Sequence, residues 1–356
     1  MLKKLQELPA TIRNSKPVKW IEQRLKRIFL PGFEGLPLYD VLTFFFRGIQ
    51  KGALTTRASA ISFTIFLALL PSSILILSLV SYIPVDNIDD ELVSRFSDLL
   101  PASVFHFIEG AMGELIGRKH NTVLSIGFVL TAYYASSSIN SILMAFNNSY
   151  HLTARRNPIK QRLIAFMLII ALAALIMIAV VLMTFSDFFF DWLRTNHYVE
   201  GSWIFAILHL SKWTLIVLIF MFAISLLYNF GTPGKKSLKV VTAGSTLATI
   251  LAITVSWGFA WYVTHFGQWN KIYGSLGTVI VLCLWIYFNA IILLIGFELN
   301  TSIASAKKQH IKMLTAFRER QEEAEAEEER LKKEKEEEIA RIEKENTTEE
   351  EEEDVP

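Results

Sequence analysis

The side chains that could do chemistry are dispersed along this chain, and they do not form a recognisable catalytic set. The seven histidines are scattered, and the two nearest to each other are His197 and His209. A metal-dependent hydrolase needs His and Asp ligands close enough together to hold its ion. The single cysteine, Cys283, has no second cysteine with which to form a disulfide or a metal-binding pair. We therefore predict that the protein is not an enzyme and has no catalytic residues, no metal and no other cofactor.

Four ionisable residues, Arg57, Asp187, Lys212 and Glu298, need weighing inside or at the ends of long apolar stretches. Arg57 and Glu298 are expected at the same depth, and we expect them to pair because a lone charge in a low-dielectric region is costly. Glu298 could then be a structural anchor or a proton carrier. Lys212 could extend outward to water, or it could pair with Asp187 or Asp191.

A second group of polar residues lies within an apolar stretch. Tyr133, Ser137, Asn140 and Ser141 are spaced so that they share one face of a helix. Such a face must contact protein or water rather than lipid. We expect it to point into a helix bundle, where it could mediate close packing or line a cavity for a solute.

Proline and glycine residues mark further candidate positions. Pro71 lies in the middle of the first apolar stretch and is expected to kink its helix, either for packing or as a hinge. Gly274 and Gly277 share one side of the start of the last stretch. Because they have no side chain, they would let a neighbouring helix or a substrate approach the backbone.

The elements that must position these residues are long apolar segments. Each exceeds the ~20 residues that a helix needs to cross the hydrocarbon core. They occupy residues 58–84, 122–146, 163–187, 203–230, 238–264 and 272–301. We therefore predict an all-α, polytopic membrane protein whose six-transmembrane-helix bundle spans residues 58–303.

The basic residues indicate how this bundle is oriented. Residues 1–57 contain eleven Lys and Arg against four acidic residues, and the connection 147–162 contains four bases and no acid. Connections 188–202 and 265–271 contain one base each. By the positive-inside rule, both termini are expected in the cytoplasm.

The flanking segments are polar. Residues 1–57 form a basic, amphipathic N-terminal segment in which 38–52 is expected to lie as a helix on anionic membrane lipid. Residues 85–121 are expected to form an outer helical loop. Residues 304–356 form a charged, acidic cytoplasmic tail that is either disordered or a single solvated helix. The net charge of +1 averages these segments and predicts no nucleic-acid partner.

Four stretches of this sequence resemble motifs of the YihY/BrkB family of bacterial membrane proteins, in order and at similar spacing. They are TRASAISF at 56–63, LYNFGTP at 227–233, YGSLG at 273–277 and GFELN at 296–300. Tyr228, Pro233 and Tyr273 become candidate functional residues through this resemblance, which covers about residues 40–305. It implies a six-helix protein of the bacterial inner membrane. Some members are labelled ribonuclease BN, a function that we reject here because the histidines are scattered.

Two functions remain open. One is a permease- or flippase-like transporter of a small solute or lipid, which the polar second helix, Pro71 and the glycines favour. The other is a non-transporting structural or assembly factor of the envelope. The sequence contains no Walker motif, so transport would be secondary or facilitated. Neither the substrate nor a homo-oligomeric state can be assigned from these patterns.

Overall fold

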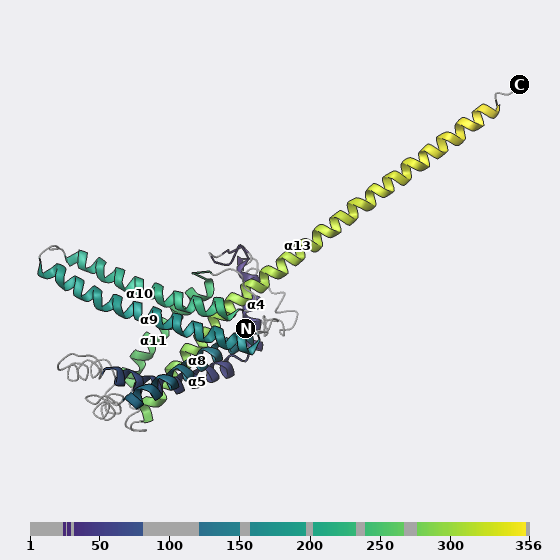
Figure 1. Ribbon diagram of the computed structural model, residues 1–356. Coiled ribbons are helices and arrows are strands. Elements are labelled where there is room, and N and C mark those ends of the chain that lie inside the picture. The colour runs from purple at the N-terminus through teal and green to yellow at the C-terminus, as the bar shows by residue number, and fades with distance from the viewer. Residues whose placement is uncertain are drawn as a thin grey trace. The chain divides into compact units, whose positions relative to one another are not determined.

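The computed structural model describes residues 24–25, 27–29, 32–80, 121–149, 157–196, 202–232, 239–266 and 276–353. The described part consists of α-helices, with one isolated β-bridge between Phe29 and Pro37 (Figure 1). The chain divides into two compact units, residues 1–303 and 304–356. Residues 85–120 of the expected outer loop, and the candidates Pro233, Tyr273 and Gly274, lie outside the described residues.

The first unit is built from long apolar helices. They are α5 (Leu54–Val80), α8 (Asn121–Asn147), α9 (Pro158–Thr195), α10 (Ser202–Gly231), α11 (Ala243–Phe266) and the first part of α13 (Leu276–Glu353). Among the described residues, α5, α9, α10, α11 and α13 are long and apolar enough to cross a membrane. The expected span 122–146 forms α8, which is not among them and which has serines, tyrosines and Asn140 at its centre.

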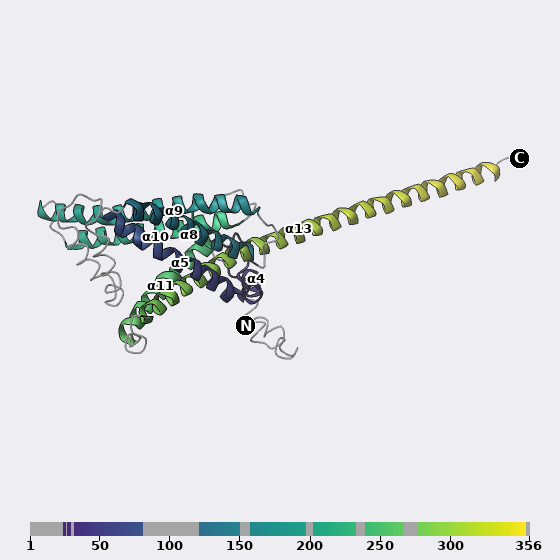
Figure 2. The same ribbon diagram turned by 60° about the horizontal axis from the view of Figure 1, so that its bottom comes forward.

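Consecutive helices pack against each other along the chain. α5 lies along α8, α8 contacts α9, and α9 and α10 form a hairpin whose arms run side by side in both views (Figures 1 and 2). The buried core contains Ile61, Leu143, Phe146, Tyr228 and Phe297. It lies where α5, α8, α10 and α13 meet.

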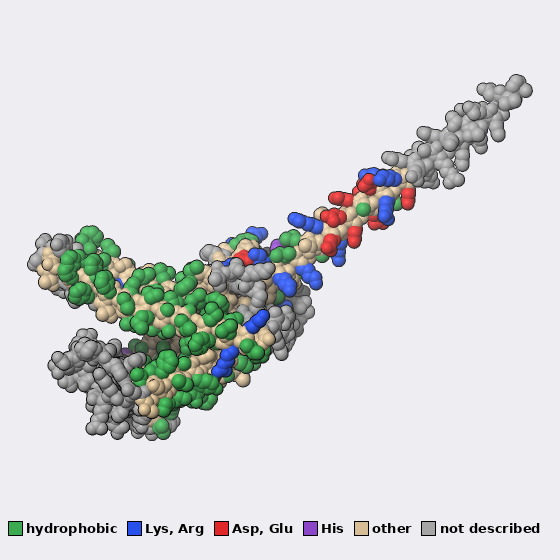
Figure 3. Space-filling model, viewed as in Figure 1, with side chains coloured by type: hydrophobic (Ala, Val, Ile, Leu, Met, Phe, Trp, Pro, Cys, Tyr) green, Lys and Arg blue, Asp and Glu red, His purple; other side chains and the backbone are tan. Residues whose placement is uncertain are grey.

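Large apolar side chains also cover the outward faces of these helices. Phe166, Met177, Phe185 and Trp257 are examples, each about half exposed or more, and Figure 3 shows the hydrophobic surface that such residues form. In water such a surface would be unfavourable, whereas in a bilayer it contacts hydrocarbon. The first unit is therefore that of a multi-pass membrane protein.

Prolines affect two helices in different ways. α9 begins at Pro158, which needs no helical donor at that position, and Asn157 caps it by accepting a bond from the Ile159 amide at 3.0 Å. α5 continues through Pro71, which leaves the carbonyl of Leu67 without its helical donor. The neighbouring Ser72 hydroxyl donates to the Ala68 carbonyl at 2.6 Å.

A shorter helix, α4 (Leu38–Lys51), precedes the bundle where the sequence predicts an amphipathic helix. Its apolar face was expected to lie in lipid, yet Val41 is fully buried and Gly48 is buried against protein. One position of this face therefore packs on protein, as do Phe33 and Leu36 in the segment just before α4. Leu42, Phe45 and Ile49 are half-buried, and the contact of this part of the face with lipid stays a prediction.

The second unit is the charged part of α13. From Lys307 to Lys335 its side chains are exposed. Glu328 pairs with Lys332 at 2.8 Å and Glu329 pairs with Lys333 at 3.0 Å, both at the i,i+4 spacing that supports a solvated helix. The helix extends to Glu353.

Candidate functional site

A buried ion pair joins the start of α5 to the first part of α13. The Arg57 Nη2 atom donates to Glu298 Oε1 at 2.8 Å, and the side chains are 8 % and 0 % exposed. Arg57 Nη1 also donates to the carbonyl of Ala145 on α8 at 2.8 Å. The structure thus brings together the two residues that the sequence predicts as partners, and it ties three helices at one point.

Further hydrogen bonds surround the carboxylate. The hydroxyl of Ser149, just after α8, donates to Glu298 Oε2 at 2.9 Å, and the Thr301 hydroxyl lies 3.5 Å from the same oxygen. Burying two charges is costly unless such bonds satisfy them. One donor, Arg57 Nε, is buried and has no hydrogen-bond partner within the described part of the chain.

The turn after α4 covers this ion pair. A Cβ atom on Gly52 would lie 2.7 Å from Arg57 Nη2 and 2.5 Å from the Gly48 carbonyl oxygen. The φ angle of Gly52 is −84°, so any residue could adopt this backbone conformation. Glycine is needed here because there is no space for a side chain.

We predict that Gly52→Ala destabilises the protein by about 1–3 kcal/mol, the usual cost of overpacking. The measurement is the melting temperature of the full-length protein in detergent. Gln50→Ala is the control, because Gln50 is exposed on α4 and its truncation removes no buried contact. Equal melting temperatures for the two variants would show that the turn does not press on the ion pair.

An aromatic cluster lies beside Glu298. The rings of Phe146 and Phe297 stack with centroids 4.0 Å apart, and the Tyr228 ring lies 5.7 Å and 5.8 Å from them. The Tyr228 hydroxyl donates to the Leu293 carbonyl of α13 at 2.8 Å. Gly231 makes room for this cluster, since a Cβ there would lie 2.3 Å from the Phe146 ring.

Helices α11 and α13 cross with their backbones in direct contact. A Cβ on Gly244 would lie 2.0 Å from the Gly296 carbonyl oxygen, and a Cβ on Gly296 would lie 2.4 Å from the Tyr228 hydroxyl. Asn300 fixes this crossing by accepting a bond from the Gly244 amide at 2.8 Å and donating to Thr242 Oγ1 at 2.9 Å. Small residues at such crossings are typical of membrane helices.

The end of α10 is fixed to the start of α11 in a similar way. Asn229 donates to the Lys239 carbonyl at 2.7 Å and accepts from the Lys239 amide at 3.3 Å. Thr242 and Ser245 then cap α11 reciprocally, each side chain accepting the other's amide. We call the set Arg57, Ser149, Tyr228, Asn229, Glu298 and Asn300 the polar cluster.

An apolar cavity of about 490 Å³ lies next to the polar cluster. Side chains of α5, α9, α10, α11 and α13 line it, among them Ile61, Ala179, Leu227 and Leu293. Ile61 follows Arg57 by one turn of α5, and the Leu293 carbonyl is the acceptor of Tyr228. Two of the lining residues therefore adjoin the polar cluster, although no member of that cluster lines the cavity itself. Figure 3 shows a hollow beneath the α9–α10 hairpin.

The lining of this cavity offers few polar groups. Asn289 supplies an amide, and its nitrogen already donates to the Trp285 carbonyl at 2.9 Å. Cavities of about 300–1,000 Å³ with apolar walls are typical binding sites for small molecules. This one suits a hydrocarbon group.

The predicted polar face of α8 is oriented differently from the expectation. Tyr133 is 55 % exposed and points outward, while Ser137, Asn140 and Ser141 are half-buried. The buried residues of this part of α8 include Ser138, Ile139, Ile142 and Leu143. The prediction for Tyr133 was wrong because α8 packs on α5 through a different side, where the Ser138 hydroxyl donates to the Thr64 carbonyl of α5 at 2.7 Å.

Asn140 bonds across to α9 rather than to a cavity. Gln161 Nε2 donates to Asn140 Oδ1 at 2.9 Å, and Asn147 donates to Gln161 Oε1 at 2.6 Å. None of the α8 candidates lines the central cavity. The bonds of Asn140 fit helix packing, which is one of the two roles that the sequence left open.

The remaining candidates lie apart from the polar cluster. Lys212 is half-buried on α10, and the side chains of Asp187 and Asp191 are outside those described. Pro71 is buried within α5, and Gly277 is buried at the start of α13. Within the described residues, no three His, Cys, Asp or Glu side chains gather as a metal site would require.

The fold and the buried ion pair define a multi-pass helical membrane protein. This chain belongs to the virulence factor BrkB family, whose family model matches residues 45–320. The match confirms the resemblance drawn from the four motifs, and it contains Arg57, Tyr228, Gly244 and Glu298.

Relatives of this chain carry two kinds of name. The ribonuclease-like protein YfkH of Bacillus subtilis is 28 % identical over 254 residues, which are 71 % of this chain and 91 % of the relative. A UPF0761 membrane protein of Xanthomonas campestris is 26 % identical over 274 residues, 75 % of this chain and 61 % of the relative. The chain thus spans less than two thirds of the Xanthomonas relatives. No solved structure matches it.

Proposed function

We propose that this protein is a permease- or flippase-like transporter that moves a lipid or an amphipathic solute across the bacterial inner membrane. The observation that carries this proposal is the apolar cavity of about 490 Å³, whose lining residues Ile61 and Leu293 adjoin the polar cluster. It joins a space for a hydrocarbon group to charged and polar side chains that could receive a polar headgroup. The proposal includes no enzymatic step.

The lining of the cavity narrows the class of substrate. A polar solute would lose its hydrogen bonds to water and find almost none in their place, at a cost of about 2–7 kcal/mol for each unsatisfied group. An acyl chain loses nothing by entering such a space. We therefore infer that the transported molecule has a large apolar part.

The polar cluster is suited to closing one end of the cavity. Arg57 and Glu298 connect α5, α8 and α13, so opening this end requires their bonds to rearrange. The unpartnered Nε of Arg57 makes the closed arrangement less stable by about 1–3 kcal/mol than a fully bonded one. A small energy difference between two states is what a transporter needs in order to alternate between them.

We infer the orientation from the charged residues. The polar cluster, Arg162 and Lys239 lie at the end of the bundle where α5, α9 and α11 begin and α8 ends. By the positive-inside rule this end faces the cytoplasm, as do both termini. Anionic lipid would then contact the basic N-terminal segment that contains α4.

A second function is favoured by one separate observation. The charged helical segment after Ile303 is exposed and polar throughout its described side chains from Lys307. A non-transporting envelope structural or assembly factor could use such a helix to contact other proteins. A homo-oligomer would also fit this function.

The experiment that separates the two functions is transport by the full-length protein in liposomes. Fluorescent phospholipids are placed in both leaflets, and dithionite added outside bleaches those that reach the outer leaflet. We expect bleaching beyond that seen in protein-free liposomes of the same composition. If liposomes with and without the protein show equal bleaching for a panel of fluorescent phospholipids and amphipathic solutes, the result would favour the assembly factor.

A further inference from the structure

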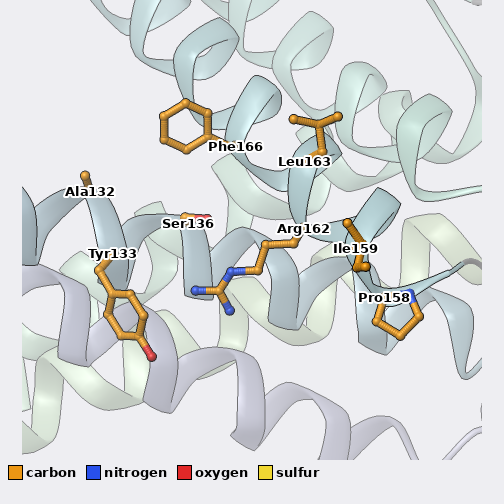
Figure 4. A pocket seen from close by; sticks show the side chains of 8 residues that line it. All are labelled: Ala132, Tyr133, Ser136, Pro158, Ile159, Arg162, Leu163 and Phe166. Atoms are coloured by element: carbon orange, nitrogen blue, oxygen red, sulfur yellow. The ribbon is translucent and has the colours of Figure 1, made fainter.

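A second hollow lies on the outside of the bundle, between α8 and the beginning of α9. It has a volume of about 720 Å³ and shares no lining residue with the central cavity. Its lining is apolar apart from Arg162, Ser136 and the Tyr133 hydroxyl. The lining residues are Ala132, Tyr133, Ser136, Pro158, Ile159, Arg162, Leu163 and Phe166 (Figure 4). We call this hollow the α8–α9 groove.

Arg162 supplies the charge of this groove. Its guanidinium carbon lies 5.4 Å from the centre of the Tyr133 ring, and the side chain extends towards that ring in Figure 4. This contact holds the cation in place without neutralising it. Among the described residues, no carboxylate lies within ion-pair distance of Arg162. The groove therefore presents an uncompensated positive charge at the edge of an apolar surface.

The positions of the charge and the apolar wall follow from the start of α9. Pro158 and Ile159 form the first turn of the helix, whose positive dipole end favours an anion. Leu163 and Phe166 follow on the next turns, and both are exposed. A molecule in the groove would thus meet cationic groups at one end and hydrocarbon along the rest.

We propose that the α8–α9 groove binds an anionic phospholipid. The phosphate accepts hydrogen bonds from the Arg162 guanidinium, which forms the planar, two-pronged contact that phosphate oxygens favour. One acyl chain lies against Leu163 and Phe166. This site is independent of the proposed transport function, because it lies outside the central cavity.

Charge complementarity selects an anionic headgroup over a zwitterionic one. The connection 147–162 contains four bases and no acid, so it offers no carboxylate to the ammonium group of a zwitterionic lipid. An ammonium group there would lie near like charges. We therefore expect phosphatidylglycerol to bind more tightly than phosphatidylcholine with the same acyl chains.

The test is native mass spectrometry of the full-length protein in detergent, titrated with dioleoyl phosphatidylglycerol or dioleoyl phosphatidylcholine. We expect Arg162→Gln to weaken phosphatidylglycerol binding about tenfold, because charge-assisted bonds to phosphate are lost. The same variant should remove the preference over phosphatidylcholine. Tyr133→Leu, which leaves the charge but removes the ring that positions it, should cause a smaller loss.

Lys160→Gln is the matched control. Lys160 is exposed in the same turn of α9 but does not line the groove, so its loss should change binding less than about twofold. An equal loss in both variants would show a general effect of surface charge and overturn the proposal. Displacement of the lipid by millimolar inorganic phosphate would also overturn it, since that result would indicate a site for the free ion. Unchanged phosphatidylglycerol binding in Arg162→Gln would likewise overturn the proposal.

Discussion

Removing either partner of the Arg57–Glu298 pair is expected to destabilise the protein severely. Arg57→Met leaves a carboxylate that is 0 % exposed without its cation, and Glu298→Gln leaves a buried guanidinium without its anion. An uncompensated buried charge of this kind costs about 3–5 kcal/mol. The measurements are the melting temperature and the fraction of monodisperse full-length protein in detergent.

The double variant Arg57→Met with Glu298→Gln should lose less than the two single variants together, because no lone charge remains. Glutamine can still accept the bond from the Ser149 hydroxyl, which donates to Glu298 Oε2 in the protein. Exchanging the two charges should not restore stability, since a carboxylate at position 57 would face the Ala145 carbonyl. Strict additivity of the two single effects would show that the residues are not coupled.

The exposed pair of Lys239 with Glu34 provides the control for this experiment. Its side chains are 45 % and 28 % exposed. We expect Lys239→Met to cost less than about 1 kcal/mol, as is usual for ion pairs that reach solvent.

The second large effect is expected at the crossing of α11 and α13. Gly296→Ala would place a Cβ 2.4 Å from the Tyr228 hydroxyl, 2.5 Å from the Gly244 carbonyl oxygen and 2.9 Å from the Ala248 Cβ. The Gly244 carbonyl oxygen is backbone and the Ala248 Cβ is a short side chain on the same packed helix. Neither atom can move unless the helix moves with it. We expect Gly296→Ala, and equally Gly244→Ala, to yield little monodisperse protein.

Gly258→Ala is the matched control for these variants, because Gly258 lies on α11 and a Cβ there would meet nothing within 4 Å. Replacing glycine by alanine in an open helical position is expected to be neutral or to stabilise by up to about 1 kcal/mol. Size-exclusion chromatography in detergent compares the three variants. If Gly296→Ala elutes and melts like Gly258→Ala, the two backbones do not meet as described.

The Arg57–Glu298 pair could be predicted from the sequence because both residues end apolar stretches on the basic side of the bundle. Charge and depth alone limit the partners that each can reach. The contributions of Ser149 and the Ala145 carbonyl could not be predicted, because they depend on how far α8 extends beside α5. Gly52 was missed for a similar reason, since its role comes from the path of the turn over the ion pair.

The orientation of α8 shows a limit of helical periodicity. Tyr133, Ser137, Asn140 and Ser141 do share one side, but α8 meets α5 on another side, through Ser138. Tyr133 then points outward to Arg162. The same polar residues make α8 too weakly apolar to count among the described membrane-spanning candidates.

Two glycines that the sequence analysis did not single out have clear roles. Gly231 and Gly296 lie in two of the four stretches that resemble the family, and in the structure they make room for the aromatic cluster and the helix crossing. A glycine inside an apolar helix weakens it unless another group needs the space. That signal was present in the sequence, but it does not reveal which helix approaches.

The central claim is that the apolar cavity is the path of the transported molecule. Dithionite bleaching of fluorescent phospholipids in liposomes tests it most directly when Ala179→Phe is compared with Ala173→Phe. Ala179 lines the cavity, whereas Ala173 is exposed on the same helix, α9. We predict that Ala179→Phe slows translocation at least about tenfold, because a ring in the cavity opposes an acyl chain by more than 1.4 kcal/mol. Ala173→Phe should match the unmodified protein. Equal rates for the two variants would contradict the claim and place the path elsewhere.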